Sequence, residues 1–283
     1  MSFIRRYKKG GKTDLNLILK LNELTEKRLV NSLDSIETFD LMNVQQKIFN
    51  NVKNAFNLTS SGVVYDVTNT YFHGKMCKIA KFGHDKEKRK GFPLVQIGLA
   101  VTQEHGIPIF HKTFPGNIND ARTFIDVSND LMKFGITRGI AVIDRGISSS
   151  KNTRFLREEK WKVLCGLKNI IKAYFDKDVV EKAFQSLKGV IRLRPIRHWP
   201  YNRVEAHVFI CYLACLLLSI LKNRVNDLDM SFQKALDELD GLYRVYLKDP
   251  RTGYKLGRLV ALTKNQEQIL RAVDKSLLKE CSE

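Results

Sequence analysis

Short apolar runs alternate with helical patterns through the middle of the chain. Five runs rich in β-branched and other apolar residues predict β-strands, at 63–67, 94–102, 107–110, 140–143 and 161–165. Residues 103–106 form a short polar connection ending in glycine, which is typical of a hairpin. The first three strands are therefore predicted to form an antiparallel meander.

Segments with helical periodicity follow the third, fourth and fifth predicted strands. Apolar residues between Phe124 and Phe134 predict a helix that begins near Asn119 or Asp120 and ends near Gly135. Residues 148–160 and 172–191 predict two more helices. The resulting order is strand, strand, strand, helix, strand, helix, strand, helix. It predicts an α/β domain, with a mixed sheet flanked by helices.

The two ends of the chain are predicted to be helical extensions of this domain. Residues 1–57 are polar with apolar residues at helical spacing, and predict a short helical N-terminal region. Residues 58–225 form the main domain, in which an apolar run at 207–221 predicts a buried helix that braces the sheet. The run is shorter than the roughly 20 residues of a membrane-spanning helix. Residues 226–283 predict a helical C-terminal tail with a turn at 249–253.

The charge balance points to a polyanionic partner. Forty-eight lysines and arginines stand against thirty acids, a formal charge of +18, which favours nucleic acid through steering and counterion release. A basic protein that is merely soluble, or one that touches anionic membrane, is the alternative. Five cysteines without a CxxC pair, and no signal-peptide pattern, indicate a reducing, cytoplasmic compartment. A disulfide framework or a zinc site is not expected.

Three carboxylates from distant parts of the chain form a candidate metal site. Asp66 lies inside an apolar strand, where a charge is costly to bury without a partner or a metal. Asp144 follows the fourth strand, and Glu181 lies on the helix after the fifth. If they converge, they could hold two divalent cations that act on a phosphodiester. Alternatively, Asp144 is only a turn residue and Glu181 a solvated carboxylate paired with a nearby lysine.

The helix that carries Glu181 also presents candidate DNA-binding residues. At about 100° per residue, Tyr174, Lys177, Glu181 and Lys188 lie within roughly 60° of one another. A separate apolar stripe on this helix is available for packing. Cationic residues follow the helix at Arg192, Arg194 and Arg197. They suit contacts with phosphates. A second basic cluster, at 81–90, is either a further DNA contact or a solvated loop.

Several of these segments together resemble the DDE transposases of bacterial and archaeal insertion sequences. The group that carries the signature Y-x2-R-x3-E-x6-K is the most similar, over roughly residues 60–225. The resemblance rests on the following segments: Tyr65-Asp66-Val67-Thr68, Gly106-Ile107-Pro108-Ile109, Pro115-Gly116-Asn117 with Asp120, Val142-Ile143-Asp144-Arg145-Gly146, and Tyr174-x2-Lys177-x3-Glu181-x6-Lys188.

The resemblance implies a ribonuclease-H-like catalytic domain. Asp66, Asp144 and Glu181 would be its catalytic metal ligands, for Mg²⁺ or Mn²⁺, with two ions. Tyr174, Lys177 and Lys188 would contact DNA phosphates near the cleaved end. The reaction implied is nicking at the ends of a transposon followed by strand transfer into target DNA. The partners implied are double-stranded DNA and a second copy of the chain, in a cytoplasmic, nucleoid-associated protein.

Three features depart from the pattern of that group, and one of them is that the region before Asp66 is short for an end-recognition domain. Lys177 replaces the arginine of the signature, which keeps the charge but loses the bidentate grip on phosphate. Asp144 and Glu181 are only 37 positions apart, whereas relatives carry a large β-rich insertion there. The chain is thus either a compact version, like the catalytic domain of retroviral integrases, or a truncated copy. A non-catalytic DNA-binding remnant and a stand-alone ribonuclease-H-like nuclease are the alternatives in function.

Overall fold

The structure is a computed structural model. It divides into two compact units, and each is described by itself. The larger unit is Asn31–Ser219, and the smaller combines Met1–Val30 with Ile220–Glu283. The description covers residues 25–38, 40–58, 62–74, 76–85, 91–136, 140–143, 154, 158, 162–165, 181–189, 191, 193, 196, 198, 200–242, 244–248, 255–259 and 261–278.

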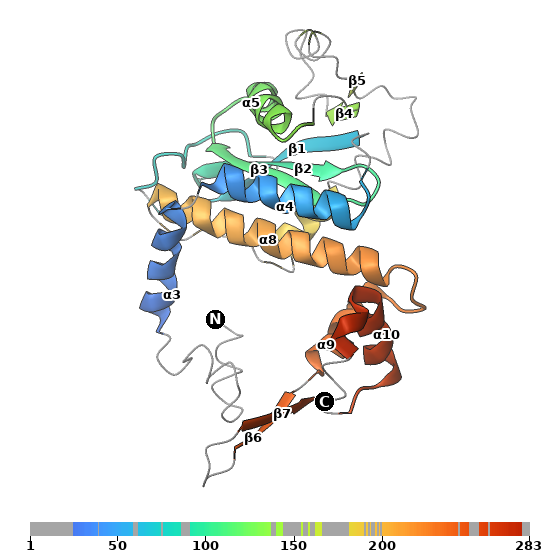
Figure 1. Ribbon diagram of the computed structural model, residues 1–283. Helices are drawn as coiled ribbons and strands as arrows, with labels where there is room; N and C mark the ends of the chain where they lie inside the picture. The colour runs from blue at the N-terminus through green and yellow to red at the C-terminus, as the bar shows by residue number, and fades with distance from the viewer. Residues whose placement is uncertain are drawn as a thin grey trace. The chain divides into compact units, whose positions relative to one another are not determined.

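A five-stranded mixed sheet forms the centre of the larger unit (Figure 1). Its strands are β1 (Gly62–Tyr71), β2 (Leu94–Thr102), β3 (Pro108–Pro115), β4 (Ile140–Ile143) and β5 (Lys162–Cys165), in the order β3-β2-β1-β4-β5. The first three strands are antiparallel neighbours, whereas β4 runs parallel to both β1 and β5. All five predicted strands are present, and β1 and β4 lie side by side.

Strand β1 is longer than its apolar run. It continues through Thr68, Asn69 and Thr70 to Tyr71, and every residue from Val63 to Tyr71 has a partner on β2. These three polar side chains are buried. The backbone ladder, rather than apolar character, therefore carries the strand beyond residue 67. Strand β3 similarly extends to Pro115, beyond the predicted 107–110.

Hydrophobic clusters cover both faces of the sheet. Because side chains of a strand alternate between faces, Val63, Tyr65 and Val67 join one cluster and Val64 joins the other. Helix α5 (Asp120–Lys133) supplies Phe124, Val127 and Leu131 to the first cluster. The helical segment 181–188 and helix α8 (Tyr201–Val225) pack into the second. The mixed sheet flanked by helices is thus confirmed.

Helix α8 has the packing expected of a core helix. Val204, Val208, Tyr212 and Cys215 are each at most 2% exposed and lie in the cluster that includes Val64. Its 25 residues exceed the predicted apolar run. In the described part of the chain, α8 is long and apolar enough to cross a membrane, by length and composition alone. A buried core helix of a soluble protein meets the same criteria.

The described part of residues 1–57 is helical. It comprises α3 (Glu26–Ser32), a 3₁₀ helix at Leu33–Thr38 and α4 (Leu41–Ala55). Asp40 caps α4, because its carboxylate accepts hydrogen bonds from the backbone N–H groups of Met42 and Asn43, at 3.1 Å each.

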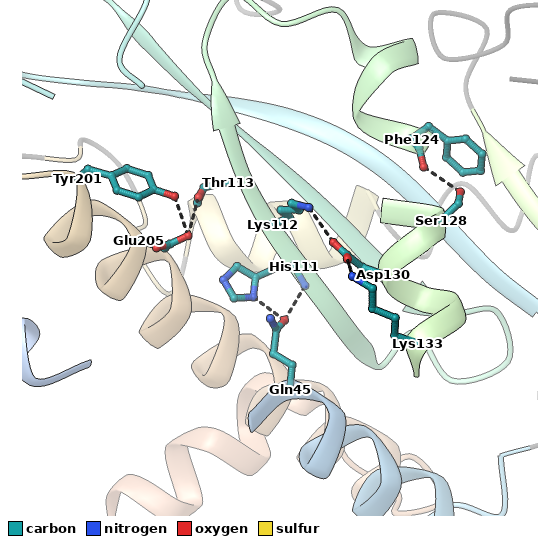
Figure 2. Close-up of polar contacts among 10 residues, drawn as sticks. All are labelled: Gln45, His111, Lys112, Thr113, Phe124, Ser128, Asp130, Lys133, Tyr201 and Glu205. Carbon is teal, nitrogen blue, oxygen red and sulfur yellow. Dashed lines mark hydrogen bonds and ion pairs between the residues drawn. The ribbon is translucent and has the colours of Figure 1, made fainter. Parts of the chain in front are cut away.

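Polar contacts join α4, α5 and α8 to strand β3 (Figure 2). Gln45 Oε1 accepts a hydrogen bond from the His111 backbone N–H at 2.9 Å and lies 2.8 Å from His111 Nδ1. Lys112 bonds to Asp130 on α5 at 2.7 Å. On α8, the Glu205 carboxylate accepts hydrogen bonds from Thr113 of β3 at 3.4 Å and from Tyr201 at 2.9 Å. Burial, with the neighbouring Glu205 carboxylate, raises the pKa of Tyr201 to about 12. These contacts fix the helices against the edge strand.

The smaller unit corrects one prediction, because the C-terminal tail is not helical throughout. Besides α9 (Phe232–Asp240), α10 (Lys264–Val273) and a 3₁₀ helix at Lys275–Leu278, it contains β6 (Arg244–Lys248) and β7 (Lys255–Leu259). These two strands pair antiparallel. In β6, a β-branched and an aromatic residue, Val245 and Tyr246, favour a strand. The predicted turn at 249–253 lies outside the described residues.

Gly116 allows three backbone segments to pack closely, and its replacement tests that packing. A Cβ at this position would overlap the carbonyl oxygens of Leu94 and Lys81. Gly116→Ala is therefore expected to lower the free energy of unfolding by about 1–3 kcal/mol, measured by urea denaturation. Gly241→Ala is the control, since its nearest contact would be an ordinary 3.4 Å. Equal stabilities of the two variants would contradict the close packing.

Candidate active site

Asp66 lies in the middle of the central strand. Its neighbours Tyr65 and Val67 are each 1% exposed and belong to the cluster beneath α5. Alternation directs the Asp66 side chain to the opposite face, which it shares with Val64. Its Cα partner on β2, Leu99, lies in the same cluster as Val64. The carboxylate is half-buried, and its Oδ1 accepts a hydrogen bond from the Val67 backbone N–H at 2.8 Å.

Glu181 lies on a helix that packs against this same face. Ala183, Phe184 and Leu187 of the segment 181–188 are buried in the cluster that contains Val64 and Leu99. Glu181 itself is exposed, at the first described residue of this segment. Asp66 and Glu181 are thus associated with one side of the sheet. Their convergence on a common metal stays a prediction.

Asp144 lies outside the described residues, but the strand that leads to it is placed. Strand β4 pairs with the first part of β1, where Val64 is the Cα partner of Val142. Each of these valines is two positions before an aspartate in the sequence. The last described residue of β4 is Ile143. The carboxyl end of β4 therefore lies beside the middle of β1, where Asp66 is.

Only one predicted DNA-binding residue is described. Lys188 is half-buried near the end of the helical segment, directly before Gly189. Residues Tyr174, Lys177, Arg192, Arg194 and Arg197 lie outside the described residues, as does part of the helix predicted at 172–191.

Residues between those arginines are joined to the end of β1. Leu193 and Ile196 are buried, and Ile196 forms a parallel bridge with Phe72. The Ile196 backbone N–H donates to the Tyr71 carbonyl at 3.1 Å, and its carbonyl accepts from the His73 N–H at 2.9 Å. The chain after the helix thus returns to the carboxyl end of the strand that carries Asp66.

Two histidines lie near this junction. The His198 and His207 rings are 5.3 Å apart, and His207 Nε2 lies 3.0 Å from the Leu193 carbonyl oxygen. Because a carbonyl oxygen only accepts, this hydrogen bond requires the proton on Nε2. Burial lowers the pKa of both histidines, and for His198 the charges of His207 and Arg203 lower it further. The lowered pKa values favour neutral imidazole rings at both positions, in a structural role.

Among the described residues, no three His, Cys, Asp or Glu side chains are grouped as a metal site. One of the three predicted carboxylates, Asp144, is not among them, so this result does not test the predicted triad. The sequence analysis gave no role to two exposed aromatic residues, Phe82 and Phe92, beside the second basic cluster. Their position among lysines was the available signal.

Comparison with protein families gives the identity of the central segment. Residues 57–178 match the transposase DDE domain. The matched segment, 122 of the 283 residues, is thus similar to a transposase DDE domain. The match includes Asp66, Asp144, Tyr174 and Lys177, and it ends shortly before Glu181. The DDE domain therefore contains the sheet described above, whose five strands all lie within residues 57–178. No curated protein matches the sequence.

Solved structures similar to this chain include complexes of the Mos1 transposase. The Mos1 paired-end complex with the left transposon end is 11% identical, with 77% of this chain and 78% of that chain covered and a TM-score of 0.27. The Mos1 strand transfer complex is 12% identical, with 77% of each chain covered and a TM-score of 0.27. At such TM-scores the likeness carries no argument about fold or function.

Proposed function

We propose that this chain is a DDE transposase that cleaves DNA at the ends of a transposon and joins those ends to target DNA. The observation that carries the proposal is the pairing of Val64 with Val142. Each residue leads into one of the two aspartates that the DDE domain match includes. Parallel strands whose residues 64 and 142 are partners favour neighbouring positions for Asp66 and Asp144.

The proposed fold of the catalytic domain is ribonuclease-H-like. Supporting this proposal, the central strand β1 has an antiparallel neighbour on one side and a parallel neighbour on the other. The helix that carries Glu181 packs on the face of the sheet to which Asp66 is directed. In this arrangement, carboxylates from two adjacent strands and one helix could share a site.

The ligands proposed for the metal are Asp66, Asp144 and Glu181. Carboxylate oxygens are hard donors that suit Mg²⁺ or Mn²⁺. The half-buried position of Asp66 in an apolar strand fits a metal ligand better than a solvated surface charge. Two such ions would activate the attacking hydroxyl and stabilise the leaving oxygen of a phosphodiester.

The proposed partner is double-stranded DNA, at transposon ends and at the target. The charge of +18 supports a polyanionic partner. In the proposed roles, Lys188, Lys177 and Tyr174 hold phosphates near the cleaved end, and Arg192, Arg194 and Arg197 extend that contact. The proposed active form is a homodimer that pairs two transposon ends. The proposed compartment is the cytoplasm, at the nucleoid. The group with the Y-x2-R-x3-E-x6-K signature is the proposed subfamily.

The proposed function is tested by an assay of both chemical steps, cleavage and joining, on DNA that carries the ends of this chain's own transposon. Inverted repeats are first identified in the sequence that flanks the gene. The purified full chain is then incubated with Mg²⁺, a labelled duplex that carries one repeat, and a supercoiled target plasmid. The expected products are a nick at the repeat end and labelled DNA joined to the plasmid. Cleavage without joining would indicate a stand-alone nuclease. The absence of both products, with DNA binding retained, would indicate a non-catalytic remnant or a truncated copy.

A further inference from the structure

Two phenylalanine side chains are exposed on the connection between β1 and β2. Phe82 is 72% exposed and Phe92 is 40% exposed. Phe92 lies against the ring of His73, with centroids 5.0 Å apart, and against Tyr71 at 6.1 Å. We call Phe82 and Phe92, with the exposed Lys78 and Lys81, the aromatic-basic surface. Large apolar side chains that a fold exposes to solvent are characteristic of binding surfaces.

The backbone beneath this surface is firmly anchored to the sheet. Lys81 and Leu94 exchange two backbone hydrogen bonds, at 3.0 and 2.8 Å. The Ile79 carbonyl accepts from the Gly116 N–H at 3.0 Å, and the His84 carbonyl accepts from the Asn69 side chain at 2.9 Å. The bridge between Lys81 and Leu94 places Phe82 and Phe92 on two adjacent backbone segments. The exposure of the two rings is therefore fixed by the fold.

The charge around the two rings selects an anionic partner. Residues 75–90 contain seven lysines and arginines against two acids. Lys78, Lys81 and His84 are exposed within the described part. An apolar protein partner or a helix groove would not require this charge. Phosphates with bases attached match both the cations and the rings, since nucleobases stack on aromatic side chains and cations hold the backbone between them.

We propose that the aromatic-basic surface binds single-stranded DNA, with bases stacked on Phe82 and Phe92 and phosphates held by Lys78 and Lys81. Stacking needs bases that are not paired, which are available only in single strands or opened ends. In the sequence, the surface is distinct from the predicted phosphate contacts at Tyr174, Lys177 and Lys188. The inference rests on the proposed function only in taking DNA as the partner. It requires no cleavage.

The test is binding of a labelled oligothymidine, and of a blunt duplex of equal length, measured by fluorescence anisotropy with the full chain. Phe82→Ala and Phe92→Ala are each expected to weaken oligothymidine binding by about fivefold or more, and duplex binding much less. Leu217→Ala is the matched control, because Leu217 is 67% exposed on α8 and has no charged residue within four positions of it in the sequence. It is expected to leave both affinities unchanged.

The lysines give a second readout. Lys78→Gln with Lys81→Gln is expected to reduce the salt dependence of oligothymidine binding, whereas Lys53→Gln, an exposed lysine on α4, is not. Unchanged oligothymidine binding in both phenylalanine variants would overturn the proposal. So would an equal loss for single strand and duplex, which would exclude stacking. Because binding is measured without cleavage, a failure of the catalytic proposal leaves this result interpretable.

Discussion

Asp66→Asn is expected to abolish metal-dependent DNA cleavage and leave DNA binding nearly intact. Loss of one ligand removes transition-state stabilisation worth several kcal/mol, which corresponds to about a thousandfold or more in rate. Asparagine keeps an Oδ1 that can accept the Val67 N–H, so the local strand contact is retained. Glu181→Gln, at an exposed position, is expected to have the same effect. The measurements are nicking of the labelled repeat in Mg²⁺ and duplex affinity across a salt series.

Asp126→Asn provides the matched control. Asp126 is an exposed carboxylate on α5, the helix that packs on the other face of the sheet. Its replacement changes the net charge by the same amount as Asp66→Asn, without touching the proposed site. Cleavage by the control should therefore stay at the wild-type rate. If duplex affinity fell as far as cleavage in Glu181→Gln, a DNA-positioning role would be the better account of Glu181.

The strands were predictable because their sequences are simple. The runs at 94–102 and 140–143 are β2 and β4 residue for residue, since each is a mostly apolar segment that follows Pro93 or Gly139 and precedes Gln103 or Asp144. The structure adds that β4 runs parallel to β1, which fits a strand reached through a helix. Tertiary context decided the rest. Pairing with β2 extends β1 through Thr68–Tyr71. In the C-terminal tail, for which the periodicity predicts helices, β6 and β7 form a hairpin.

The residue types of the candidate site could be predicted from the sequence better than the contacts that surround them. Asp66 could be identified because a carboxylate within an apolar strand is unusual, and the structure shows it half-buried there. The exposed rings of Phe82 and Phe92 could not be identified in this way. Their exposure depends on the bridge between Lys81 and Leu94 and on the close approach of Gly116, which are contacts between segments distant in sequence. Local patterns carry no information about such contacts.

The buried His111 is expected to make the larger unit sensitive to mild acid. Its ring is stacked on Tyr212 and Phe209, with centroids 4.7 and 5.7 Å away, and its Nδ1 lies 2.8 Å from Gln45 Oε1. Burial lowers the pKa of His111 to about 3 from its ordinary 6.5. Below pH 6.5 the unfolded chain therefore binds a proton that the folded chain does not. Stability is complete above pH 6.5 and falls as the pH drops toward 3, by about 1.4 kcal/mol per pH unit.

Urea unfolding at pH 7.5 and pH 5.0 measures this effect. His111 is expected to account for a loss of about 2 kcal/mol between the two values. His198 and His207, whose pKa values are also lowered, add to the loss in the same direction. His111→Phe isolates the single residue, because it keeps a ring for stacking and a backbone N–H for Gln45 while removing the titrating group. The variant should lose about 2 kcal/mol less than the wild type over this interval. Equal losses in the two proteins would mean that the folded chain protonates His111 and that its environment is more polar than the packing against Tyr212 and Phe209 implies.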